Sequence, residues 1–247
     1  MGTSTSYSAP PSWGDLKGEV TRAAGEGVVT NDKAGQLLRS FIGHNGGARA
    51  MSGRAGGGRD HAAGSVTSGH AARGVASRLG GFISDVTRFG LDAALRNAGW
   101  ADLAGRTVRE ILNSLLDRIG GEASTIDDVD ARMALARLQE KYFAEAATTE
   151  ELEQLLNAQV DRLDGLLQDY FGFYLYEVFC RVFFERLVQR VGEVKAYSFL
   201  SEISDFINST LTNRAAHHNM TEINWSSVEG QALVSEIMET TLHVFGG

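Results

Sequence analysis

Apolar residues recur at three- and four-residue steps along most of the chain, which is the spacing of one buried face of an α-helix. No segment alternates apolar and polar residues as a half-buried strand does, and no repeat of solenoid length is visible. The sequence therefore predicts an all-α fold. The pattern predicts helices over residues 15–24, 31–42, 79–97, 107–119, 126–147, about 195–213 and about 226–244.

The longest apolar pattern begins at Thr148 and continues through Phe171 without a stop signal. Between Phe171 and Phe184 it is apolar on almost every side, which is typical of a helix enclosed by other helices. We therefore expect a helical bundle around one long apolar central helix.

Polar residues mark several of the predicted helix starts. Thr107 and Glu110 have the spacing of a capping box, and residues 148 and 151 repeat that spacing. Asn31 is the expected N-cap of the helix over residues 31–42.

The composition changes between Gly43 and Gly81, where 12 glycines accompany five arginines and one acidic residue. Residues 43–66 have too little apolar surface to offset the entropy of ordering so many glycines, so we expect this stretch to be mobile, with helix returning after Ser68. The predicted organisation is a flexible N-terminal tail (1–12), short helices (13–42), a Gly/Arg-rich flexible segment (43–68) and a helical domain (69–247).

Charge is distributed unevenly along the chain. Residues 1–121 carry 14 Lys+Arg and 10 Asp+Glu (+4), and residues 122–247 carry 9 and 21 (−12), which sum to the net charge of −8. The acidic second half disfavours nucleic acid, so any contact with a polyanion is expected from the first half. No apolar stretch has the ~20 residues of a membrane span, and the start has no secretory signal, so we expect a cytoplasmic protein.

Residue types that often carry catalysis occur here in settings that favour structural roles. The single cysteine, Cys180, excludes an intramolecular disulfide and a multi-cysteine zinc site, and its apolar surroundings indicate a buried thiol. The acidic pairs 127–128 and 150–151 fall in first helical turns, where the macrodipole and capping account for them. The histidine pair 217–218 lacks metal-ligand spacing. We expect a non-enzymatic chain that binds no metal or cofactor itself.

The Gly/Arg-rich segment lacks the Gly-Lys-Ser/Thr ending of a phosphate-binding loop. Its arginines, Arg49, Arg54 and Arg59, are candidates for contact with RNA, DNA or an acidic partner surface. A solvated linker that folds only against a partner is the alternative interpretation.

The N-terminal tail, MGTSTSYSAPPS, is small and hydroxylated and contains both prolines of the chain, Pro10 and Pro11. Removal of Met1 exposes the α-amine of Gly2, which has a pKa of about 8, so a useful fraction is neutral and nucleophilic. At roughly 3.3 Å per residue, the segment from Gly2 to Ser12 reaches about 35 Å from the body. Such a tail fits another protein's active site. An ordinary disordered terminus is the alternative. So is N-myristoylation in a peripheral membrane protein, although no basic cluster supplies a second anchor.

The start MGTSTSYSAPP, followed by a Gly/Arg-rich tract and a long helical region, resembles the QatB family of bacterial anti-phage (Qat) defence operons. The resemblance is most specific over Met1–Pro10. It implies a non-catalytic subunit whose companions are an ATPase, a QueC-like enzyme and a TatD-like nuclease.

The resemblance further implies that a QueC-like partner, using ATP and a deazaguanine, conjugates the base to an N-terminal glycine. In this sequence the acceptor is Gly2, and the helical body is the scaffold. The residues expected to be recognised in the partner's channel are Thr3, Ser4, Thr5, Ser6 and Tyr7.

Overall fold

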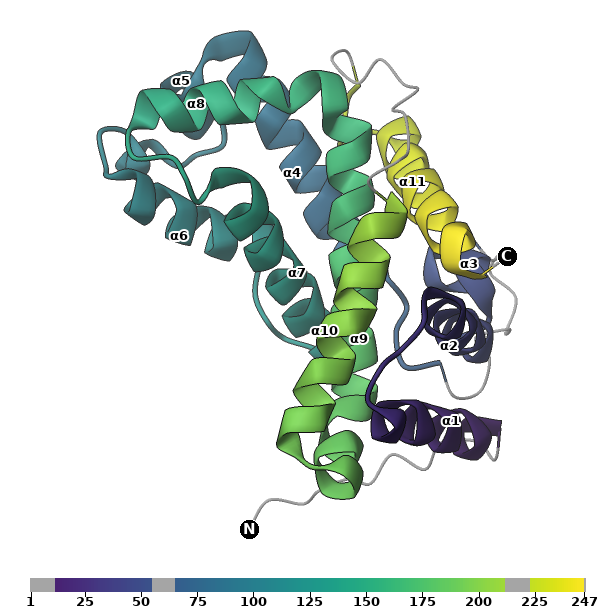
Figure 1. The fold of residues 1–247 in the computed structure, drawn as a ribbon. Coiled ribbons are helices and arrows are strands. Elements are labelled where there is room, and N and C mark those ends of the chain that lie inside the picture. Colours follow the sequence, from purple (N-terminus) through teal and green to yellow (C-terminus); the bar gives the residue numbers. More distant parts are fainter. Residues whose placement is uncertain (1–11, 55–64, 212–222, 247) are drawn as a thin grey trace.

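The structure is a computed structural model that describes residues 12–54, 65–211 and 223–246. Every regular element in these ranges is helical, which confirms the all-α prediction (Figure 1). The first half contains α1 (Ser12–Glu26), α2 (Asn31–His44), α3 (Gly47–Met51), α4 (His70–Phe89), α5 (Leu91–Asn97), η1 (Ala101–Leu103) and α6 (Val108–Gly120). The second half contains α7 (Ile126–Phe143), α8 (Thr149–Ala158), η2 (Val160–Arg162), α9 (Leu163–Val191), α10 (Glu193–Leu211) and α11 (Val228–Gly246).

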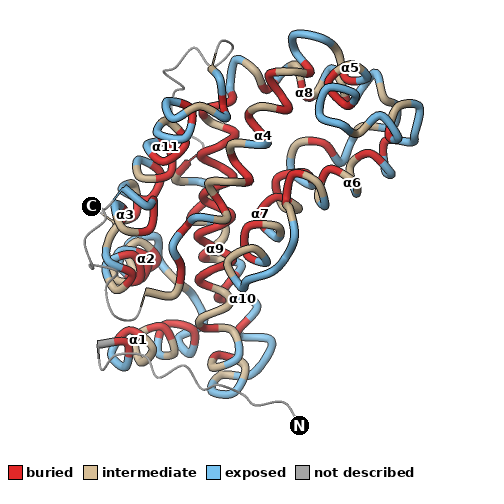
Figure 2. The backbone as a smooth tube through the Cα atoms, turned by 180° about the vertical axis from the view of Figure 1, so that it is seen from behind, coloured by how far each residue is buried: buried red, intermediate tan, exposed pale blue. Residues whose placement is uncertain are grey.

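The predicted central helix is α9, whose residues are mostly buried along their length (Figure 2). α1, α4, α7, α10 and α11 all pack against it. The pattern that starts at Thr148 does not form one helix, however. It is divided into α8 and α9 by the 3-10 turn η2. α8 contacts α4 and α7, and α9 contacts these two helices together with α1, α10 and α11.

Threonine side chains cap the helices at several starts. The capping boxes at Thr107 and Thr148 are confirmed, and Thr125 forms a third with Asp128. The N-cap of α2 is Thr30 instead of the predicted Asn31, because the Thr30 hydroxyl accepts a hydrogen bond from the Lys33 amide at 3.3 Å.

Part of the segment expected to be mobile is helical. α3 lies within residues 43–66, and its Ala48 and Met51 are buried against α2 and α11. The high glycine content argued against a helix here, but the burial of Ala48 and Met51 against α2 and α11 stabilises this short helix. Helix returns at His70, as expected after Ser68.

Ion pairs link α7 to α9. Arg137 pairs with Glu177, and Arg181 Nε lies 2.8 Å from an Asp130 carboxylate oxygen. Both carboxylates are almost completely buried, so each needs its arginine to offset the loss of hydration.

The first described helix is anchored by Trp13, whose side chain is 1% exposed. Its indole packs edge-on against Phe41 at 5.9 Å and His44 at 5.4 Å between ring centroids. These contacts fix the start of α1 against α2. No described helix has the length and apolar character to cross a membrane.

Candidate functional site

Most residues that the sequence singled out for function lie outside the described ranges. These are Gly2, Thr3, Ser4, Thr5, Ser6, Tyr7 and Arg59, together with the histidine pair 217–218. Among the candidates for polyanion contact, only Arg49 and Arg54 have a described position.

Arg54 forms ion pairs with two acidic side chains. Its Nη1 lies 3.2 Å from a Glu239 oxygen and 3.9 Å from a Glu236 oxygen, both on α11. Arg49 Nε donates to the Arg54 carbonyl at 3.4 Å. Arg54 therefore fastens the end of α3 to α11, and its charge is offset within the protein.

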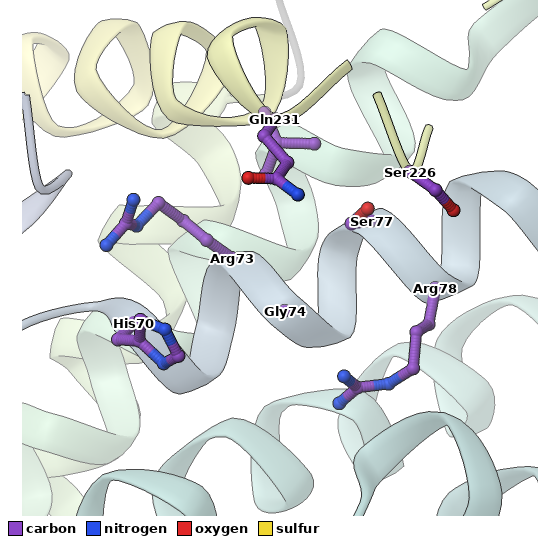
Figure 3. A pocket seen from close by; sticks show the side chains of 8 residues that line it. His70, Arg73, Gly74, Ser77, Arg78, Ser226 and Gln231 are labelled. Carbon is purple, nitrogen blue, oxygen red and sulfur yellow. The ribbon is translucent and has the colours of Figure 1, made fainter. Parts of the chain in front are cut away.

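A cleft of about 340 Å³ lies between α4 and the start of α11 (Figure 3). Its basic side chains come from one helix, since residues 70, 73 and 78 all belong to α4. No acidic side chain of the described chain lines it. The lining residues are His70, Arg73, Gly74, Ser77, Arg78, Ser226, Gln231 and Val234.

Arg73 is fixed at one end of this cleft, near His70 (Figure 3). Its Nε donates to the Gly69 carbonyl at 3.3 Å and its Nη1 to Ser235 Oγ at 3.4 Å. The guanidinium also lies against Gly53, where an added Cβ would be 2.5 Å from Arg73 Cζ. Burial is the main influence on the Arg73 pKa and lowers it.

Arg78 contributes differently, because its guanidinium turns toward the end of α6 (Figure 3). Nε donates to the Ile119 carbonyl at 2.7 Å and Nη2 to the Gly120 carbonyl at 3.5 Å, so Arg78 satisfies two carbonyls at that helix C-terminus. Burial lowers the Arg78 pKa as well. Neither Arg73 nor Arg78 has an ion pair with a carboxylate in the described part of the chain.

The far wall of the cleft is positioned by Trp225. Its indole Nε1 donates to Ser84 Oγ at 2.9 Å, and its carbonyl accepts from Ser77 Oγ at 2.7 Å. The Trp225 ring rests on Gly80, and these contacts set where Ser226 and α11 begin relative to α4.

The two carboxylates of the acidic pair 127–128 form hydrogen bonds with two different helices. Asp128 caps its own helix through Thr125, as expected of a first-turn carboxylate. Asp127 instead reaches the start of α4, where it accepts from Thr67 Oγ1 at 2.6 Å, from the Ala71 amide at 3.3 Å and from the Tyr174 hydroxyl. Both carboxylates lie in the first turn of α7, as the sequence predicted, but the hydrogen bonds of Asp127 reach the start of α4 and Tyr174 and do not cap α7.

Cys180 is half-buried, less enclosed than the sequence indicated, and it lies near Tyr176 and Glu177. Burial raises the pKa of its thiol to about 12, which disfavours the nucleophilic thiolate. Within the described ranges, no group of three or more His, Cys, Asp or Glu side chains is arranged to hold a metal ion.

The sequence did not identify the cleft as a site. His70, Arg73 and Ser77 follow one another at steps of three and four, which places them on one helical face. That signal was present, but glycines at positions 69, 74, 80 and 81 made the stretch resemble an extension of the flexible tract. Nothing in the local sequence indicates that residues 226–234 lie beside this face of α4.

Comparison with known proteins gives one match. A family model described as Qat anti-phage system associated protein QatB matches residues 46–245. No curated protein and no solved structure matches the chain significantly. The matched range covers α3 to α11 and excludes residues 1–10, where the sequence resemblance was most specific.

Proposed function

The chain belongs to the QatB family of Qat anti-phage system associated proteins, and from that membership we propose that it is a non-catalytic substrate and scaffold subunit of a bacterial anti-phage defence complex. Gly2, after removal of Met1, is the acceptor for a deazaguanine-type base attached by a QueC-like partner. An ATPase and a TatD-like nuclease complete the proposed set of partners. The family match supports a role in an anti-phage defence system. The tail sequence supports the proposed modification of Gly2.

The proposed reaction is an amide bond formation at the glycine amine. The partner activates the carboxyl group of a carboxyl-deazaguanine with ATP, which gives an acyl adenylate and releases pyrophosphate. The neutral Gly2 nitrogen then attacks the acyl carbon, AMP leaves, and the nitrogen loses a proton. This chain contributes only the nucleophile and the small side chains of Thr3 to Ser6, which present no steric obstacle in a narrow channel.

Two features of the body support a substrate and scaffold role. Trp13 packs against Phe41 and His44, so the start of α1 is held firmly on the body. The residues of the body that most resemble catalytic groups, Cys180 and Asp127, are committed to packing and to helix capping.

Intact-mass measurement tests the proposal directly. The protein is co-expressed with the QueC-like partner, and we expect loss of Met1 together with a gain equal to the deazaguanine acid minus one water. Fragmentation should place the added mass on Gly2.

A Gly2→Ala variant and a chain with a blocked terminus should show no gain. Gly14→Ala is the matched control, because an added Cβ at residue 14 meets nothing within 4 Å, and this variant should be modified normally. An unchanged mass after Met1 loss, with a partner shown to be active, would rule out Gly2 as the acceptor.

A further inference from the structure

The cleft between α4 and α11 contains the guanidinium of Arg73, which forms no ion pair with a carboxylate among the described residues. Charged side chains that lose hydration are normally paired, because desolvation is costly. Burial lowers the pKa of Arg73, and the nearest compensating carboxylate is Asp127, which acts only at a distance. Asp127 already accepts hydrogen bonds from Thr67, Tyr174 and the Ala71 amide.

Arg73 is held in place without using all of its donors. Of the five N–H donors of a guanidinium, only those to the Gly69 carbonyl and Ser235 Oγ have acceptors in the described chain. The remaining donors form a fork that suits two oxygens of a phosphate. His70 lies at the same end of the cleft, one helical turn earlier (Figure 3).

Apart from Arg78, whose guanidinium turns toward the end of α6, the rest of the cleft is uncharged and larger than one phosphate group. Gly74 leaves its side of α4 open, while Ser77, Ser226 and Gln231 offer hydroxyl and amide groups and Val234 an apolar surface. A volume of about 340 Å³ lies in the range of small-molecule sites. We infer that this cleft binds a small phosphate-bearing molecule of nucleotide size, with its phosphate at Arg73 and His70 and its remainder along Gly74 and Ser77. The inference concerns a site separate from Gly2 and is independent of the proposed function.

Isothermal titration of the full chain, without any partner, tests this site with ATP and with pyrophosphate as probes. We expect saturable binding of ATP, weakened at least about tenfold by Arg73→Gln, because hydrogen bonds to charged groups contribute strongly. Arg96→Gln makes the same change in net charge on α5, outside the cleft, and should bind as the wild type does. Tighter binding of ATP than of pyrophosphate assigns the remainder of the cleft to the nucleoside, and equal binding assigns the site to inorganic phosphates.

A second variant separates shape from charge. An added Cβ at Gly74 would lie 3.3 Å from Arg78 Nη1, so Gly74→Leu must shift that guanidinium slightly, and the folded variant should narrow the cleft and abolish ATP binding while Arg73 is unchanged. Circular dichroism melting verifies the fold of each variant. The inference is overturned if ATP shows no saturable binding, or if folded Arg73→Gln and Gly74→Leu bind ATP as the wild type does. Arg73-dependent binding of a single-stranded oligonucleotide without binding of ATP also overturns it, in favour of a polymer.

Discussion

Trp225 rests directly on Gly80, so that a Cβ added at residue 80 would lie 2.7 Å from the indole carbon Cε3. This contact joins the segment before α11 to the middle of α4. The same indole donates to Ser84, one turn further along α4. The absence of one side chain thus determines how closely two segments about 145 residues apart approach each other.

We predict that Gly80→Ala destabilises the protein. Alanine favours helix over glycine by about 0.5–1 kcal/mol, but overpacking against a buried indole costs about 1–3 kcal/mol. The net loss should be about 1–2 kcal/mol, measured by urea unfolding. Gly81→Ala is the neighbouring control, since its Cβ would make an ordinary 3.7 Å contact with Trp225. A Gly80→Ala variant as stable as Gly81→Ala contradicts the described contact.

A second prediction concerns the buried carboxylate of Glu177. Arg137→Met removes its ion-pair partner and leaves a charge with 5% side-chain exposure, which should lower the free energy of unfolding by about 3–5 kcal/mol. The comparison is Arg106→Met, which breaks an exposed pair with Glu110 and should cost less than about 1 kcal/mol. Denaturant titration of both variants measures the difference, and equal losses would mean that Glu177 is hydrated.

Cys180 gives a prediction about pH. Burial raises its thiol pKa to about 12, so the folded chain has far less thiolate than the unfolded chain at neutral pH. Alkylation by iodoacetamide should be slow in buffer and fast in urea. Because the folded state holds the proton more tightly, the thiol's contribution to stability is complete below pH 9 and is lost as the pH rises toward 12. Rapid labelling of the folded protein would contradict the assigned environment.

Local signals in the sequence predicted helix type and several caps well. Thr107 with Glu110 and Thr148 with Glu151 are defined within four residues, and the structure contains both capping boxes. Features that depend on contacts between helices could not be predicted in the same way. The apolar pattern runs through Gln159 without interruption, although the structure divides this segment into α8, η2 and α9.

The cleft could not be predicted from local sequence patterns for a similar reason. Its basic side comes from residues 70–78 and its far wall from residues 226–234, and no pattern within either stretch indicates the other. The docking of α3 depends on Ala48 and Met51, whose burial only the partner helices make favourable.

Because Arg73 packs on Gly53, we expect some glycines of the glycine-rich tract to tolerate no substitution. Gly53 has φ of +71°, and Gly69, at +62°, has Met238 Cε 2.7 Å from where its Cβ would stand. Each of these positions accepts glycine alone, both for conformation and for space. A saturation-mutagenesis profile of this low-complexity stretch should therefore show sharp intolerance at these two sites, and natural lengthening or shortening of the tract should be confined to the interval between them.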